Sequence, residues 1–338
     1  MSKFNIAVVG ATGNVGREIL SILNERNFPV KKIFALASKK SEGKRIDFGS
    51  KKIKVQSLET FNFKNSDIVL SSAGSAISES FIKKASDSGA ITIDNTSCFR
   101  MNKDVPLIVP EVNVKEISKW KKKKIISNPN CSTIQLVTAL KPIHDAFKIK
   151  RIIVSTYQST SGAGKKAMDE LFYQTLDVYK NKNLKSDIFS KQIAFNVIPQ
   201  IDVFLDDGKT KEEWKLIEET KKILDNKIKV FATCVRVPVF IGHALSVNIE
   251  TQSSINEKKL NKVMEDFEGI NVIDNPSNNE YVTPDEIAGK DEVFVSRLRK
   301  DDSVKNGISL WIVADNLRKG AALNTVQIAE ELIKMKIK

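Results

Sequence analysis

The sequence predicts an α/β protein of two domains: a doubly wound domain with a mainly parallel sheet, followed by an α+β domain. Over the first 130 residues, apolar strand-like runs alternate with helical patterns, and this βαβ rhythm is typical of a parallel sheet covered by helices. Beyond residue 130 the strand-like runs are longer and are interleaved with helices, which favours an antiparallel or mixed sheet. At 338 residues, the chain is long enough for each domain to bury its own core.

In the first domain, apolar periodicity predicts strands and helices in alternation. They are a strand at Asn5–Val9, a helix at Asn14–Leu23, strands at Lys32–Ala37 and Ser66–Ser71, a helix at Ser78–Ser86 and a strand at Ala90–Asp94. The run Lys119–Lys124 is expected to be an exposed surface stretch, because like charges repel and stay hydrated. A further short strand is predicted at Ile125–Ser127, ended by Asn128-Pro129-Asn130.

In the second domain, the same reasoning predicts three long strands and three helices. The strands are Lys150–Gln158, Val230–Val239 and Ala244–Glu250, and the helices are Lys165–Tyr179, Lys211–Asp225 and Glu257–Phe267. Asp206–Thr210 is predicted as a turn and Asp274–Glu280 as a polar loop. The last segment, Gly320–Met335, has apolar residues at helical spacing, so we expect it to pack back on the first domain.

Net charge is +13, and most of the excess lies in the first 130 residues, which hold 23 basic and 12 acidic side chains. Such an excess would suit nucleic acid, an anionic membrane or small anionic ligands. No stretch approaches the length of a membrane span or shows a secretory leader. Three cysteines without paired spacing indicate neither a disulfide framework nor a zinc site, so we expect no metal and a cytoplasmic protein.

The first strand runs directly into a glycine-rich turn, Gly10-Ala11-Thr12-Gly13-Asn14-Val15-Gly16, and then into an amphipathic helix. Glycines at such a turn let the backbone approach a pyrophosphate, which sits on the free N–H groups of the helix N-terminus. The spacing departs from Gly-x-Gly-x-x-Gly and is weak as a motif alone, but its place in a βαβ unit favours a dinucleotide site.

The turn after the second predicted strand favours NADP over NAD. That strand ends in Ser38-Lys39-Lys40-Ser41 and carries no acid to accept the ribose 2′-hydroxyl. Hydroxyl and ammonium groups there would attract a 2′-phosphate. The alternative is an exposed turn of small and basic residues.

Cys131 is the candidate nucleophile. It follows a strand, Pro129 and Asn130, and precedes the apolar run Ile134–Leu140, so Asn130 is a plausible N-cap and Cys131 falls in the first helical turn. The unpaired N–H groups and the helix dipole at that position favour the thiolate. Neither Cys98 nor Cys234 opens a helix, so we interpret both as structural.

A thiolate reaction also needs a group that handles protons, and the chain has two histidines. His144 falls near the end of the Cys131 helix, where a cation has an adequate structural explanation. His243 lies in a glycine-hinged break between two strand-like runs, which suits a site residue. Arg236 sits in an apolar run and needs an anionic partner, for which a substrate carboxylate is our hypothesis. Arg100 is a second candidate anion clamp, with a surface ion pair as the alternative.

Together these pieces resemble the aspartate-semialdehyde dehydrogenases, along essentially the whole chain and in order. The motifs that carry the resemblance are Gly10–Gly16, Ser-Asn-Pro-Asn-Cys-Ser-Thr at 127–133, Gln158 with Ser161-Gly162-Ala163-Gly164, Lys-Glu-Glu-Trp-Lys at 211–215, Arg236-Val237-Pro238 with His243, and Asp-Asn-Leu-Arg-Lys-Gly-Ala-Ala-Leu-Asn at 315–324. Departures are few: Cys98 and Thr96 stand where Ala and Ser are expected, and both substitutions are conservative in size.

The resemblance implies reversible conversion of L-aspartyl 4-phosphate to L-aspartate 4-semialdehyde and phosphate, with hydride from NADPH, on the route to lysine, methionine and threonine. It implies a Rossmann-like NADP-binding domain, 1–130, completed by a C-terminal helix, 316–338, and a catalytic and dimerisation domain, 131–315. A homodimer or a tetramer of dimers is the implied assembly.

The resemblance also implies a role for each matched residue. Cys131 would form a thioester, His243 would handle protons and Gln158 would orient the intermediate. Arg236 and Glu212 would hold the substrate carboxylate and amino group, and Arg100, Asn130 and Lys215 would hold phosphate. The implied NADP contacts are Gly10, Thr12, Gly13, Asn14, Val15, Ser38, Lys40, Ser41, Ser161, Gly162 and Asn316.

Two rival functions share features with this sequence. An N-acetyl-glutamyl-phosphate reductase has a similar domain plan and also uses a Cys thioester, but the Lys-Glu-Glu-Trp-Lys segment and the Arg236–His243 spacing favour aspartyl phosphate. A nucleic-acid binder would need basic and aromatic residues on one face. The aromatic residues of the first domain fall mainly among apolar or turn residues instead.

Overall fold

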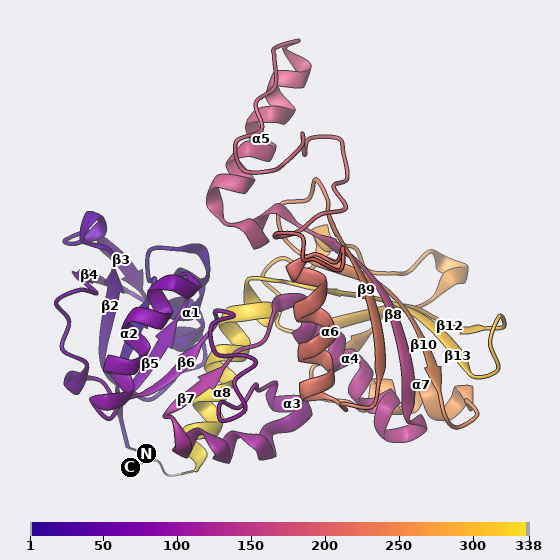
Figure 1. Ribbon diagram of the computed structural model, residues 1–338, viewed down its shortest axis with the longest axis horizontal. Helices are drawn as coiled ribbons and strands as arrows, with labels where there is room; N and C mark the ends of the chain where they lie inside the picture. The colour runs from indigo at the N-terminus through magenta and orange to yellow at the C-terminus, as the bar shows by residue number, and fades with distance from the viewer. Residues whose placement is uncertain (1, 336–338) are drawn as a thin grey trace. The chain divides into compact units, whose positions relative to one another are not determined.

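A computed structural model describes residues 2–335 of the chain (Figure 1). The chain divides into two compact units, the first made of residues 1–130 and 321–338 and the second of residues 131–320. Residues 316–320, which we assigned to the first domain, belong to the second unit, where Asn316 bonds to the turn after β8. Residues 336–338 of the predicted C-terminal helix lie outside the described part.

The first unit is built on a sheet with the strand order β3-β4-β2-β1-β5-β6-β7. The strands are β1 (Phe4–Val9), β2 (Val30–Ala37), β3 (Arg45–Phe48), β4 (Lys51–Ser57), β5 (Ile68–Ser71), β6 (Ile91–Asp94) and β7 (Ile125–Ser127). Every neighbouring pair is parallel except β3 with β4. The predicted doubly wound parallel sheet is therefore confirmed, and the β3–β4 hairpin is an addition to it.

Helices cover both faces of this sheet. They are α1 (Asn14–Glu25), α2 (Ser75–Asp87), the short α3 (Pro110–Asn113) and α8 (Leu323–Lys334), with 3₁₀ turns at Lys39–Ser41, Phe63–Asn65 and Val114–Lys122. Ile6 and Val8 of β1 pack with α1 and α8 on one face, whereas Ala7 and Val9 pack with α2 on the other. This alternation follows from the period of two along a strand that is buried on both sides.

The second unit holds a mixed sheet with the order β11-β12-β13-β10-β8-β9. Its strands are β8 (Ile149–Gln158), β9 (Lys229–Arg236), β10 (His243–Thr251), β11 (Ile270–Val272), β12 (Val293–Asp301) and β13 (Gly307–Ala314). The α+β expectation is confirmed, although β11, β12 and β13 were not predicted as strands. β9 ends at Arg236 rather than Val239, in keeping with Pro238, which has no N–H to donate to a sheet.

Four helices accompany this sheet: α4 (Cys131–Phe147), α5 (Lys165–Tyr179), α6 (Lys211–Ile223) and α7 (Glu257–Glu265), besides 3₁₀ turns at Thr160–Ala163, Pro276–Asn278 and Pro284–Glu286 and a π turn at Arg318–Ala322. α4 packs on the sheet, α6 packs on β9, and both α6 and α7 contact α4. The other sheet face carries Tyr157, Phe231 and Trp311, of which Phe231 is 58% exposed. α5 projects from the sheet in Figure 1 and exposes Phe172, Tyr173 and Tyr179.

Between residues 2 and 335, no helix has both the length and the apolar character needed to cross a membrane.

Candidate active site

Strand register brings three of the predicted residues to one end of the second sheet. Gln158 and Arg236 are the last residues of the parallel strands β8 and β9, and they are register partners. His243 opens the antiparallel strand β10 opposite Gln158. Because these positions share one edge of the sheet, an amide, a guanidinium and an imidazole meet there. All three side chains are at least 95% buried.

Cys131 is the first residue of α4, as the sequence predicts. The side-chain amide of Gln135, one turn along α4, donates to the backbone oxygen of His243 at 3.2 Å, which ties the start of this helix to β10. A methyl group at Gly320 would lie 2.8 Å from the Cβ of Cys131. Gly320 therefore allows the backbone to pass directly against the cysteine, and the thiol stays half-buried at a helix N-terminus.

Arg236 is held by the backbone and by nearby negative charge. Its Nη1 donates to the carbonyl oxygen of Ser159 at 2.7 Å. Burial lowers the pKa of the Arg236 guanidinium, while the charges of Glu212 and Cys131 act in the opposite direction. A methyl group at Gly162 would lie 3.0 Å from Arg236 Nη1, so this glycine keeps open the space in front of the guanidinium.

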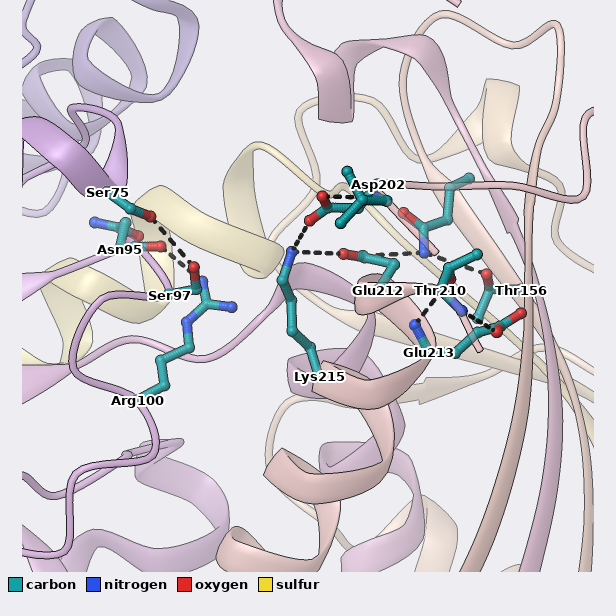
Figure 2. A network of polar contacts seen from close by, with 12 residues as sticks. Ser75, Asn95, Ser97, Arg100, Thr156, Asp202, Thr210, Glu212, Glu213 and Lys215 are labelled. Atoms are coloured by element: carbon teal, nitrogen blue, oxygen red, sulfur yellow. Dashed lines mark hydrogen bonds and ion pairs between the residues drawn. The ribbon is translucent and has the colours of Figure 1, made fainter. Parts of the chain in front are cut away.

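A chain of polar contacts links α6 to β8, as Figure 2 shows. Lys215 Nζ contacts Glu212 Oε2 at 3.2 Å, one helical turn away, and Asp202 Oδ2 at 2.8 Å. Gln158 donates from Nε2 to Glu212 Oε1 at 3.3 Å. Burial alone would lower the pKa of Lys215, but attraction to Glu212 and Asp202 outweighs it, so the pKa is raised and the ammonium stays charged.

The N-terminus of α6 is fixed by a capping box. Thr210 Oγ1 accepts from the Glu213 amide at 3.3 Å, and the Glu213 carboxylate accepts from the Thr210 amide at 2.8 Å. The same carboxylate accepts from the Cys234 amide in β9 at 3.0 Å. Helix start and strand are thereby joined, which sets the positions of Glu212 and Lys215.

Two residues of this site were missed at the sequence level. Asp202 lies in a loop at φ +70° and completes the pairing of Lys215. The Ser159 amide donates to His243 Nδ1 at 3.1 Å, and the Ser159 hydroxyl also lies 3.1 Å from this nitrogen. Ser159 adjoins the predicted residue Gln158, which was the only signal for it. Nothing in the sequence separates Asp202 from the acids of the following turn, Asp206 and Asp207.

Arg100 and Asn130 lie in the first unit, and both are 7% exposed. Arg100 donates from Nε to the carbonyl of Asn128 at 2.9 Å and from Nη2 to the carbonyl of Asn95 at 2.7 Å. These two bonds to backbone carbonyls fix the plane of the guanidinium. Such a group is suited to an anion.

The glycine-rich turn of the first unit has the geometry expected of a dinucleotide site. Gly10 adopts φ +79°, and a methyl group at Gly16 would lie 2.2 Å from the Gly10 oxygen, so both positions require glycine. Gly13 precedes α1 without a side-chain cap, and no acid lies in the first helical turn. Thr12, Asn14 and Val15 complete the turn. Backbone N–H groups at this helix start fit a phosphate.

Other predicted cofactor residues are divided between the units. Ser38 precedes and Lys40 and Ser41 lie within an exposed 3₁₀ turn that follows β2. Ser161, Gly162 and Asn316 belong to the second unit, where Ser161 and Asn316 hydrogen-bond to each other. Cys98 and Cys234 differ from Cys131 in their surroundings. Neither begins a helix, and burial raises the pKa of both thiols.

Comparison with known proteins agrees with this arrangement. Residues 5–120 match the family "Semialdehyde dehydrogenase, NAD binding domain", and residues 140–319 match "Semialdehyde dehydrogenase, dimerisation domain". An aspartate-semialdehyde dehydrogenase of Aquifex aeolicus is 52% identical over 334 residues and covers 98% of both chains.

Two solved structures of similar proteins are complexes with small molecules. Aspartate semialdehyde dehydrogenase II from Vibrio cholerae complexed with ASA aligns over 99% of both chains, with 48% identity and a TM-score of 0.97. The Candida albicans enzyme with NADP aligns over 100% of both chains, with 25% identity and a TM-score of 0.77. Together with the two matched domains, this full-length similarity shows that the chain belongs to the aspartate-semialdehyde dehydrogenase family.

Proposed function

We propose that this protein is an NADP-dependent aspartate-semialdehyde dehydrogenase that converts L-aspartyl 4-phosphate to L-aspartate 4-semialdehyde through a thioester on Cys131. The observation that carries the proposal is the grouping, within one unit, of a helix-opening cysteine, a buried imidazole, a buried guanidinium and a Glu212–Lys215 pair. The family membership makes the protein an oxidoreductase of aldehyde chemistry and of amino-acid biosynthesis. The route to lysine, methionine and threonine is part of the proposal.

Cys131 is the nucleophile in the proposed reaction. Its sulfur attacks the carbonyl carbon of the acyl phosphate, the C–O bond to phosphate breaks, and a thioester forms. NADPH held at the Gly10–Gly16 turn would supply the hydride that reduces this thioester, and loss of the aldehyde would then restore the Cys131 thiolate. His243 manages the protons of these steps, and Gln158 orients the intermediate.

Charge complementarity supports the assignment of the substrate groups. Arg236 offers a planar guanidinium for the α-carboxylate, and Glu212 offers a carboxylate for the α-ammonium group. Lys215, Arg100 and Asn130 are the proposed ligands of the phosphate. Lys215 is one turn from Glu212 on α6, so both side chains lie on one helix face. That face can bind the phosphate through Lys215 and the ammonium group of the same substrate through Glu212.

The preference for NADP is supported by the absence of an acid after β2, where the exposed turn holds Ser38, Lys40 and Ser41. A nicotinamide cofactor fits the Gly10–Gly16 turn, whose backbone leaves no room for a Cβ at Gly16. The similar Candida albicans structure contains NADP. The remaining proposed contacts are Ser161, Gly162 and Asn316.

A spectrophotometric assay tests the proposal. With aspartate semialdehyde and inorganic phosphate, the protein should reduce NADP, and omission of phosphate should abolish the reaction. We expect kcat/KM for NADPH to exceed that for NADH by at least about tenfold, a difference of about 1.4 kcal/mol. N-acetylglutamate semialdehyde is the matched substrate for the rival reductase. Faster turnover of that aldehyde, or turnover without phosphate, would contradict the assignment.

A further inference from the structure

His243 receives hydrogen bonds at Nδ1. The backbone N–H of Ser159 lies 3.1 Å from this nitrogen, and an amide N–H has no lone pair to accept with. Nδ1 therefore presents its own lone pair to the amide. In the neutral imidazole the proton is then carried by the other nitrogen, Nε2.

Asn316 connects this contact to the rest of the turn. Its Oδ1 accepts from the Gly242 amide at 2.9 Å, and its Nδ2 donates to Ser161 Oγ at 2.9 Å. Ser161 Oγ is 2.9 Å from Ser159 Oγ, which in turn is 3.1 Å from His243 Nδ1. Both hydroxyls also lie 3.1 Å from Asn316 Oδ1.

Each hydroxyl has a single proton, and each could donate it to Asn316 Oδ1. Asn316 Oδ1 already accepts from the Gly242 amide, so we assign the two protons to the line. Asn316 Nδ2 then donates to Ser161, Ser161 to Ser159, and Ser159 to His243 Nδ1. The relay then points in the same direction as the Ser159 amide. Two independent donors thus converge on Nδ1.

Nε2 faces the opposite way. The His243 side chain is fully buried, and Nε2 has no hydrogen-bond partner among residues 2–335. A methyl group at Gly162 would lie 3.2 Å from Nε2 and 3.0 Å from Arg236 Nη1. The Nε2–H group is therefore directed beside the guanidinium, at the space that Gly162 keeps open.

The surroundings oppose a charged imidazole. Burial, reinforced by the positive charge of Arg236 on β9, lowers the pKa of His243 to about 3. The register partners of His243, Gln158 on β8 and Ala314 on β13, are uncharged, and Gln135 on α4 contacts its backbone oxygen.

We propose that Asn316 is a positioning residue that acts through Ser161 and Ser159 to hold His243 as a neutral imidazole protonated at Nε2. His243 then meets the substrate as a hydrogen-bond donor to the acyl oxygen, where negative charge develops as the hydride adds. The helix N-terminus and Arg236 favour the thiolate of Cys131. This use of the donor rests on the proposed function.

Nitrogen-15 NMR of the imidazole rings tests the protonation state without any turnover. The chain has only two histidines, so a His144→Gln variant assigns both sets of signals. We expect His243 to show an unprotonated Nδ1 and a protonated Nε2, unchanged from pH 8 to pH 5.5. A proton on Nδ1, or an imidazolium that titrates within this range, would overturn the proposal.

An Asn316→Asp variant separates positioning from cofactor contact. The carboxylate oxygen that replaces Nδ2 cannot donate to Ser161, so the hydroxyls of Ser161 and Ser159 donate toward the carboxylate and no longer toward His243. The negative charge of the carboxylate favours protonation of His243. We expect His243 to titrate between pH 5.5 and 8 and kcat, measured at saturating NADP, to fall at least about tenfold, whatever the change in Kd at this proposed NADP contact. A Ser161→Ala variant interrupts the relay without adding charge, and it serves as a second test if Asn316→Asp fails to fold. In this variant we expect the His243 Nδ1 resonance to shift.

Unchanged imidazole signals together with a tenfold weaker NADP complex would make Asn316 a cofactor contact only and would overturn the positioning role. If the wild-type protein fails to turn over aspartate semialdehyde, the proposed function fails, while the NMR result still decides the protonation state. The two failures are therefore distinguishable.

Discussion

At the scale of single residues, backbone groups fix the two arginines of the candidate site. Arg100 donates to two backbone carbonyls and Arg236 to one, which sets the planes of both guanidinium groups. Ser159 serves Arg236 and His243 at once, through its carbonyl and its amide. Because one residue bonds to both, the Arg236 and His243 side chains have little freedom to move.

Arg236→Lys should weaken substrate binding more than it slows chemistry. A lysine has no fork that bonds the Ser159 carbonyl and a carboxylate together, so we expect KM for aspartate semialdehyde to rise at least about tenfold with a smaller change in kcat. Arg151→Lys, in a surface ion pair with Glu250, is the matched control and should leave both constants unchanged. Steady-state kinetics measures both variants. An unchanged KM for Arg236→Lys would count against the carboxylate role.

Cys131→Ser should remove turnover while the cofactor still binds. A serine hydroxyl at the same helix start stays protonated, so we expect kcat to fall at least about a thousandfold and the Kd for NADP to change less than about twofold. Cys98→Ser, which changes a half-buried thiol of the first unit, is the control and should retain activity. Substantial turnover by Cys131→Ser would refute the thioester mechanism.

At the scale of elements, the start of α6 is the joint that positions the Glu212–Lys215 pair. Thr210→Ala breaks one half of the capping box, and loss of such a cap costs about 1 kcal/mol. We expect the free energy of unfolding to fall by that amount in urea denaturation and KM for phosphate to rise about two- to fivefold. Thr210→Ser keeps the accepting oxygen and should behave as wild type. A stability loss without any change in KM would separate the cap from the site.

Elements with strong apolar periodicity could be predicted from the sequence, and weakly periodic ones could not. Lys165–Tyr179 has the same limits in the structure as in the prediction, and β7 was placed at the right residues. The β3–β4 hairpin was not predicted, because β4 buries only the alternate positions Val55 and Ser57, among exposed lysines and a glutamine. Cys131, Arg236 and His243 could be proposed from the sequence because local context marks each one. Asp202 and Ser159 act through a loop conformation and a backbone amide, which the sequence does not encode locally.

At the scale of the whole molecule, one face of the second sheet carries aromatic side chains, and Val282 and Ile287 pack on this face beside Trp311. Tyr157 and Trp311 pack together with ring centroids 5.6 Å apart, and Phe231 extends the apolar area on the edge strand β9. The matched family is a dimerisation domain, and exposed apolar faces of this kind form interfaces between subunits.

Phe231→Asp should therefore weaken the dimer. A carboxylate buried against a second copy without a partner costs several kcal/mol, so we expect the dissociation constant to rise at least about a hundredfold in sedimentation experiments. Phe231→Leu keeps the side chain apolar and should remain dimeric. Circular dichroism checks that both variants fold. A dimer unaffected by Phe231→Asp would assign the interface to another surface, such as the exposed aromatic residues of α5.

The return of the chain to its first unit has a consequence for synthesis on the ribosome. Leu323, Val326 and Leu332 of α8 are core residues of the unit that begins at the N-terminus, and Arg26 forms an ion pair with Glu330 at 2.8 Å. Residues 131–320, by contrast, form a unit without any later segment. The half that is translated first therefore completes its core last. α1 is made early, but the part of the sheet face that α8 covers stays exposed until α8 emerges.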